Sequence, residues 1–167
     1  MHDIKISSEY RALFNPAFCA VLLREASLSA ERTAKVRGTE SFSFCASFLI
    51  LPAVLHEPIR RKLPKTVATS FATWLSSNPL LRSQFVSLAG ITKEITRQGM
   101  LFGVSHGALS IEAGRLTPSG SMKLQLPEYE SGATEMGECV RAAQFMGRWL
   151  PSAGNTTTVL ALLGMRA

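Results

Sequence analysis

The segment 66–120 constrains the fold most, because its hydrophobic spacing changes from that of helices to that of strands. Apolar residues recur every three or four positions as far as Phe102, which predicts three helices in succession. Asn78-Pro79 separates the first two, since asparagine is a favoured N-cap and proline suits the first helical position. Beyond His106, Leu109 and Ile111 alternate with polar residues, and a turn at 112–114 completes the pattern of a β-hairpin.

Three helices followed by a hairpin is the element order of a winged helix-turn-helix. We therefore expect a mainly α fold with a small β-hairpin, in which a winged helix-turn-helix-like core (66–120) carries N-terminal helices (14–56) and C-terminal helices (133–165). All of these elements are expected to form a single domain (1–167). This fold occurs in DNA readers and in protein-docking modules, so it does not decide function.

The flanking segments have helical patterns of their own. Asn15-Pro16 predicts a helix start with an end near Ala26, and the polar stretch 27–40 is expected to be a loop or a frayed helix. The segment 44–55 is apolar all round and predicts a buried helix. A loop is expected over 119–132, an amphipathic helix over 135–150, and a last short helix over 156–163, where the three threonines leave a strand as the alternative.

The composition favours a subunit of an assembly over a solitary enzyme. Hydrophobic residues make up 46% of the chain and charged residues only 18%, against about 25% in a typical soluble domain. Apolar surface that remains after folding would need a partner to cover it. The net charge of +6 is compatible with a nucleic acid or an acidic protein as partner.

No pattern in the sequence predicts catalysis or a cofactor. The carboxylates are scattered, and no nucleophile elbow, zinc-hydrolase or phosphate-loop motif occurs. Cys19, Cys45 and Cys139 lie in apolar helical patterns without a paired cysteine, so we expect buried, reduced thiols and no metal. His56 and His106 are expected to cap or hydrogen-bond at element boundaries. The absence of a signal pattern and of a long apolar run predicts a cytoplasmic protein without a membrane span.

The densest basic cluster is the candidate for contact with DNA phosphates. It consists of Arg60, Arg61, Lys62 and Lys65. Contact of this kind needs charge and no base readout, so it would be independent of sequence. An exposed charged loop that contacts nothing is equally compatible with these residues. The outward face of the third predicted helix is expected to offer Thr92, Lys93, Thr96 and Arg97, with Glu94 beside them. These are few basic residues for a recognition helix that reads base edges.

The C-terminal helices are the candidate interface with a protein partner. Phe145 and Trp149 lie one turn apart and offset from the apolar stripe of their helix, with Arg148 beside them. Aromatic and arginine side chains are frequent interface anchors. We expect these three residues and Leu163 to contact a partner; the alternative is that both rings close the core.

Several short segments, in order along almost the whole chain, resemble the middle component of three-component ABC systems, the small subunit of Lamassu-type bacterial operons. They are Asn15-Pro16-Ala17-Phe18, 51–56, 74–79, 101–107, 142–149 and Leu162-Leu163-Gly164-Met165-Arg166. The resemblance implies a non-enzymatic subunit that bridges an SMC-like ABC ATPase and an effector, often a nuclease, in defence against phages and plasmids. It also implies a complex that senses foreign or broken DNA. The alternatives are a small winged-helix DNA-binding transcriptional regulator and, more remotely, an enzyme with a novel site.

Overall fold

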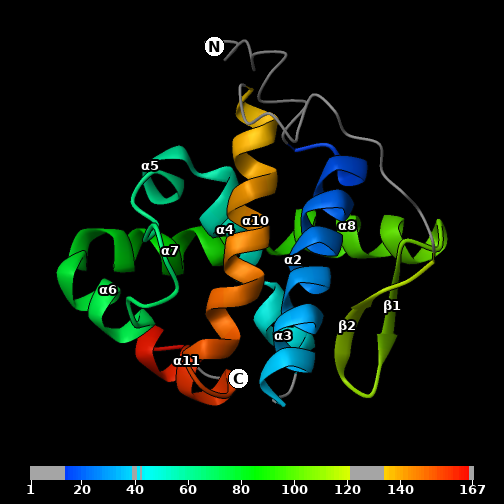
Figure 1. The fold of residues 1–167 in the computed structure, drawn as a ribbon. Coiled ribbons are helices and arrows are strands. Elements are labelled where there is room, and N and C mark those ends of the chain that lie inside the picture. Colours follow the sequence, from blue (N-terminus) through cyan, green and yellow to red (C-terminus); the bar gives the residue numbers. More distant parts are fainter. Residues whose placement is uncertain (1–13, 39–40, 42, 121–133, 166–167) are drawn as a thin grey trace, which may run out of the picture.

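The computed structural model is mainly helical with one small hairpin, and it describes residues 14–38, 41, 43–120 and 134–165 (Figure 1). The predicted loop over 119–132 lies almost wholly outside these residues. The elements are α2 (Pro16–Arg37), α3 (Phe44–Ser47), α4 (Ile50–Leu55), α5 (Glu57–Arg60), α6 (Phe71–Ser77), α7 (Pro79–Ile91), α8 (Lys93–Ser105), β1 (Leu109–Glu112), β2 (Arg115–Pro118), α10 (Glu135–Ser152) and α11 (Thr156–Leu163).

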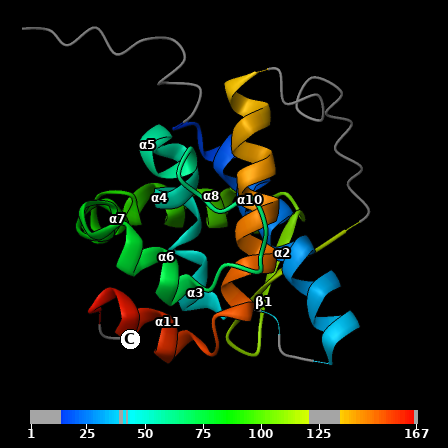
Figure 2. The same cartoon turned by 60° about the vertical axis from the view of Figure 1, so that its left-hand side comes forward.

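Two long helices, α2 and α10, lie side by side at the centre of the molecule (Figures 1 and 2). Glycine allows their close approach, since a Cβ on Gly147 would overlap the carbonyl oxygen of Ala26. On another side of α2, Gly99 of α8 packs in the same way against Cys19. Glycines recur every four residues at Gly99, Gly103 and Gly107, a spacing typical of a close-packing face. Gly99 and Gly103 are close contacts of this kind, whereas a Cβ on Gly107 would meet nothing within 4 Å.

The first helix is longer than the sequence predicted. The stretch 27–40 was expected to be a loop or frayed helix, but α2 continues through it to Arg37. Ser27 and Thr33 donate hydrogen bonds to the carbonyl groups four residues earlier, at 2.8 and 2.9 Å. Their hydroxyls are therefore satisfied within the helix, and Ala26 and Ala30 are fully buried beside them.

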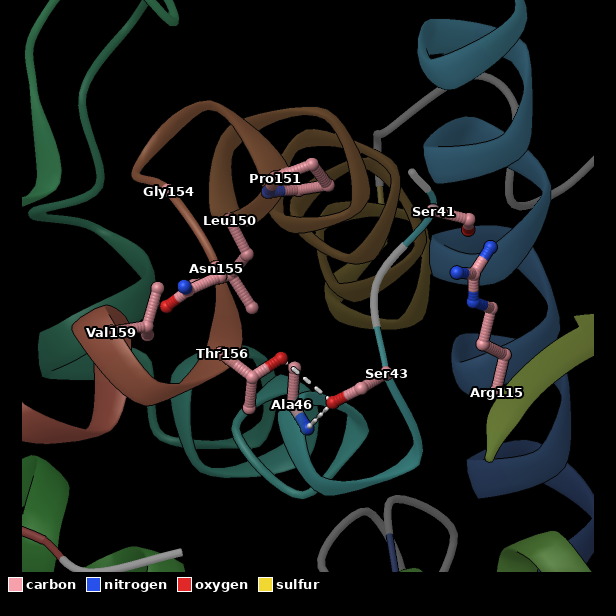
Figure 3. A pocket seen from close by; sticks show the side chains of 10 residues that line it. All are labelled: Ser41, Ser43, Ala46, Arg115, Leu150, Pro151, Gly154, Asn155, Thr156 and Val159. Carbon is pink, nitrogen blue, oxygen red and sulfur yellow. Dashed lines mark hydrogen bonds between the residues drawn. The ribbon is translucent and has the colours of Figure 1, made fainter. Parts of the chain in front are cut away.

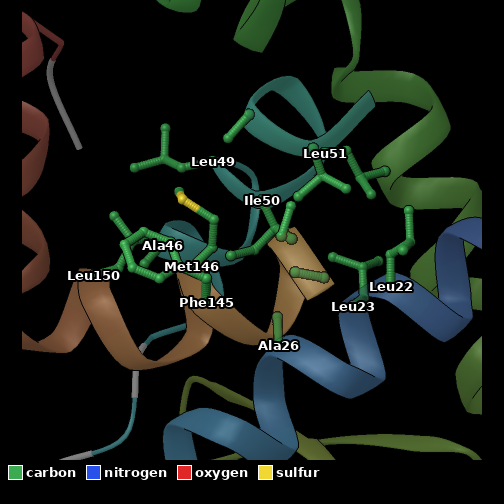
Figure 4. Packing of buried hydrophobic residues seen from close by; sticks show 14 of the residues in the cluster. Leu22, Leu23, Ala26, Ala46, Leu49, Ile50, Leu51, Phe145, Met146 and Leu150 are labelled. Carbon is green, nitrogen blue, oxygen red and sulfur yellow. The ribbon is translucent and has the colours of Figure 1, made fainter. Parts of the chain in front are cut away.

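The apolar segment 44–55 contributes to the core, but it forms two helices where the sequence predicted one. Every residue of α4 is buried, as predicted, whereas the chain turns at 48–49 between α3 and α4. Figure 4 shows Ile50 and Leu51 meeting Leu22 and Leu23 of α2 and Met146 of α10.

The boundary between α6 and α7 falls at Asn78-Pro79, as predicted, but the capping differs. The side chain of Asn78 makes no cap hydrogen bond to α7. Its amide nitrogen instead donates to the carbonyl oxygen of Trp74 at 2.8 Å, and so satisfies the end of α6.

The hairpin follows α8 as predicted, with Leu109 opposite Pro118 and Glu112 opposite Arg115. Its turn places Ala113 and Gly114 at positive φ (47° and 72°), the backbone of a type I′ turn.

A winged-helix core is nevertheless not confirmed. β2 packs against α2, and the N–H of Phe44 donates to the carbonyl oxygen of Gly114 at 2.8 Å. The helices α6, α7 and α8 share few contacts with one another, and so do not form a core of their own.

Both predicted C-terminal helices are present. Thr134 caps α10 and Asn155 caps α11, where the alternative of a strand is wrong. α10 runs two residues beyond the predicted end at 150, and Pro151 lies inside its last turn.

Candidate interaction surfaces

Arg60 is a buried structural residue and not an exposed phosphate contact. Its guanidinium group donates to the carbonyl oxygen of Val54 at 2.8 Å and lies 3.0 Å from Glu135 and 3.6 Å from Glu138. The side chain is only 5% exposed. A contact of Arg60 with DNA phosphates, as predicted from the sequence, would therefore require its guanidinium group to leave the carbonyl oxygen of Val54 and both carboxylates.

The other three cations of the predicted cluster are exposed. Arg61 forms an exposed ion pair with Glu57 at 2.8 Å, and such a pair adds little stability. Lys65 and Arg61 line a groove of about 670 Å³ with Arg141 and Arg148 of α10. The sequence placed Arg148 in a protein interface and did not include Arg141 among its candidates; the structure brings both to the basic groove.

Trp149 belongs to the core. Its ring is fully buried and packs against Phe71, Trp74 and Phe145 at centroid distances of 5.1, 5.6 and 5.3 Å. The indole N–H donates to the carbonyl oxygen of Thr69 at 2.7 Å, so its polar atom is also satisfied inside the protein.

The other members of the predicted partner interface divide in the same way. Phe145 is 9% exposed and Leu163 is 3% exposed, whereas Arg148 is exposed. The two rings and Leu163 are therefore buried in the core and are not exposed to a partner. This arrangement agrees with the alternative, in which both rings close the core.

Large apolar side chains are instead exposed on α8. Leu101 is 68% exposed, Val104 42% and Phe102 36%. The sequence pattern places Ile91, Ile95 and Phe102 on one face of the third helix. Ile95 does pack against the core, whereas Ile91 is the last residue of α7 and is 74% exposed. The positions of the glycines could have predicted this exposed surface. α8 buries the face that carries Gly99 and Gly103, so its larger apolar residues face the solvent.

The first half of α8 offers little for reading DNA bases. Lys93 and Arg97 are exposed as expected, whereas Thr92 and Thr96, expected on the same face, are only 3% and 0% exposed. Glu94 lies among the exposed residues and accepts a hydrogen bond from Gln98 at 3.3 Å. A recognition helix presents donors and acceptors along its exposed face, whereas the second half of α8 presents apolar side chains. This helix therefore does not support the alternative that the protein is a DNA-binding transcriptional regulator.

Two of the three cysteines are buried, as predicted, while Cys45 is exposed and corrects that expectation. Burial raises the pKa of the Cys19 thiol to about 12, with a smaller contribution from Cys139. Burial also raises the pKa of Cys139 to about 11; Arg60 opposes this rise, and Glu135 and Glu138 add to it. Both groups are thus neutral, unreactive thiols near neutral pH.

A pocket of about 360 Å³ lies between α3, the start of α11 and β2 (Figure 3). Its polar groups are mostly engaged: the hydroxyls of Ser43 and Thr156 are 2.7 Å apart, and Asn155 accepts from the backbone of Thr158. Among the described residues that line it, none is a carboxylate, histidine or cysteine.

Within the described ranges, no group of three histidine, cysteine or acidic side chains is placed to hold a metal ion. In the same part of the chain, no helix combines the length and apolarity needed to cross a membrane.

The fold and its surfaces define a small, mainly helical protein that exposes both an apolar helix face and a basic groove. The chain belongs to the ABC-three component (ABC-3C) system Middle Component 3 family, whose sequence model matches residues 4–167. No curated protein and no solved structure matches it. As a middle component of a multi-component ABC defence system, it has partner proteins.

Proposed function

We propose that this chain is a non-enzymatic bridging and regulatory subunit of a Lamassu-type system. It links an SMC-like ABC ATPase to an effector, for which a nuclease is our expectation, in antiphage and antiplasmid defence in the cytoplasm. Membership of the middle-component family carries this proposal, because a component of that kind works through its partners.

The exposed apolar residues of α8 support a bridging role. Leu101 and Val104 lie on the same side of the helix, and both keep more than 40% of their surface in contact with solvent. Grouped apolar side chains that face water commonly mark interaction sites. We assign this face of α8 to the ATPase.

Co-purification of the subunit with the ATPase tests the assignment. The double variant Leu101→Ala/Val104→Ala should reduce recovery of the ATPase at least tenfold, since two apolar anchors together contribute on the order of 2 kcal/mol. Its fold should be retained, because both side chains lie outside the core.

The matched control is Gln98→Ala/Ser105→Ala, which truncates two exposed polar residues of the same helix. It should co-purify like the natural chain. Normal recovery of the ATPase by the Leu101/Val104 variant would overturn the assignment of α8.

A further inference from the structure

Two adjacent grooves form one basic strip across the molecule, which we name the arginine strip. The first lies between the 61–65 segment and α10; in Figure 2 the chain between α5 and α6 crosses in front of α10. The second groove, of about 360 Å³, lies between α10 and the last turns of α2. Arg148 lines both grooves and so joins them. The exposed cations of the strip are Arg32, Arg37, Arg61, Lys65, Arg141 and Arg148.

The strip carries a large excess of positive charge. Among the described residues that line the two grooves, Glu138 is the only carboxylate, and it lies 3.6 Å from the buried Arg60. Within the described part of the chain, Arg32, Lys65 and Arg148 have no ion-pair partner. Mobile counterions or an external polyanion can balance these charges.

We infer that the arginine strip binds the phosphate backbone of duplex DNA without reading its sequence. Five of its six cations are arginines, whose planar guanidinium groups match phosphate oxygens in pairs. Arg141 and Arg148 are seven residues apart on one helix, which separates them by about 10 Å along its axis. That distance corresponds to about three phosphates of one strand, at about 3.4 Å of duplex axis each.

The residues that line the strip favour the backbone of duplex DNA as its partner over a single-stranded nucleic acid or a protein. Phe145 is the one aromatic residue among the described lining residues, and at 9% exposure its ring is not available for stacking unpaired bases. In the part of the chain that the structure describes, Val36 is the only large, strongly exposed apolar side chain in the strip, and the others lie on α7, α8 and β1. A polar, arginine-rich surface is typical of protein–DNA interfaces, whereas protein interfaces have an apolar centre.

Salt-dependent binding of the full chain to a mixed-sequence DNA duplex tests the inference. The variant Lys65→Ala/Arg141→Ala/Arg148→Ala should bind at least tenfold more weakly at low salt. Its slope of log affinity against log salt should fall by about two to three units, because about 0.9 unit is lost per phosphate contact. Fluorescence anisotropy measures both quantities, and circular dichroism verifies the fold of the variant.

The matched control is Arg82→Ala/Lys93→Ala/Arg97→Ala, which removes three exposed cations of α7 and α8 outside the strip. It should leave the slope unchanged. The inference is overturned if this control loses as much as the strip variant, if the strip variant keeps its slope, or if affinity follows base sequence. Competition by poly-glutamate at equal charge concentration, with the same potency as duplex, would also overturn it and assign the strip to an acidic protein segment. None of these measurements involves the ATPase or the apolar side chains of α8, so their outcomes are distinguishable from failure of the proposed function.

Discussion

At the scale of single residues, burial determines what the cysteine thiols can do. Cys19 and Cys139 lie in the core, and removal from water raises the pKa of both well above the ordinary value. Cys45 is exposed at the start of the short helix α3. Only a thiolate that solvent can reach reacts rapidly with an electrophile, so the three thiols should differ sharply in reactivity.

Alkylation at pH 8 should therefore label Cys45 alone in the folded protein and all three cysteines after denaturation. Peptide mapping by mass spectrometry measures the sites. Cys45→Ser is the matched variant and should abolish native-state labelling. Rapid native labelling of Cys139 would contradict its burial in the core.

The same shifts predict a loss of stability at alkaline pH. Unfolded cysteines ionise from about pH 9, whereas folded Cys19 and Cys139 keep their protons until about pH 12 and 11. Between these limits the native state binds more protons, so the free energy of unfolding should decrease as pH rises above 9.

Arg60 and Arg61 show where inference from single residues stops. The sequence correctly marked a basic cluster, but adjacent arginines have opposite environments: Arg60 is buried and Arg61 exposed. The carboxylates that make burial of Arg60 possible come from Glu135 and Glu138, about 75 residues away. A local charge pattern contains no information about such distant partners.

At the scale of elements, the α2–α10 pair depends on a position without a side chain. The Cβ of any larger residue at 147 would overlap backbone atoms of Ala26, and backbone cannot swing aside as a side chain can. The two central helices would have to move apart. Their separation would disturb the core that both share with α4.

Gly147→Ala should accordingly destabilise the protein by about 1–3 kcal/mol, the usual cost of overpacking, despite the better helix propensity of alanine. Chemical denaturation monitored by circular dichroism measures the change. Gly90→Ala is the matched control in α7, where a Cβ would meet nothing within 4 Å. It should be neutral or stabilise by up to about 1 kcal/mol. Equal stability of the two variants would show that the helices do not approach so closely.

Helix starts were the best-predicted features of the elements, because capping is local. Asn15 accepts from the N–H of Ala17 at 2.8 Å, and Asn155 from that of Thr158 at 2.9 Å. The extent of α2 was missed because its last turns contain polar residues, and Ser29 and Ala34 are buried there by tertiary packing. The exposed face of α8 was also missed. Large apolar residues such as Phe102 are normally expected to face the core, but in α8 glycines occupy positions on the buried face.

At the scale of the whole molecule, segments distant in sequence share one hydrophobic core. It contains residues of α2, α4, α6, α10 and α11, and Trp149 packs directly on Phe71 and Trp74 of α6. The sequence predicted most elements and their order, but it grouped residues 66–120 as a separate centre. Packing instead distributes these helices around α2 and α10, and no periodicity within a single segment specifies which neighbour it will meet.

The position of Trp149 leads to a prediction about stability instead of binding. Trp149→Ala should lower the free energy of unfolding by about 3–5 kcal/mol, as expected for removal of a large buried ring. Thermal unfolding should then shift down by about 10 °C or more for a chain of this size. The neighbouring Arg148→Ala should change stability by less than about 0.5 kcal/mol, because that side chain is exposed. Trp149→Phe should fall between the two, since it keeps an aromatic ring but removes the donor to Thr69. If the Trp149→Ala variant melts like the natural chain but no longer co-purifies with the ATPase, the core assignment is wrong and the ring belongs to the partner interface.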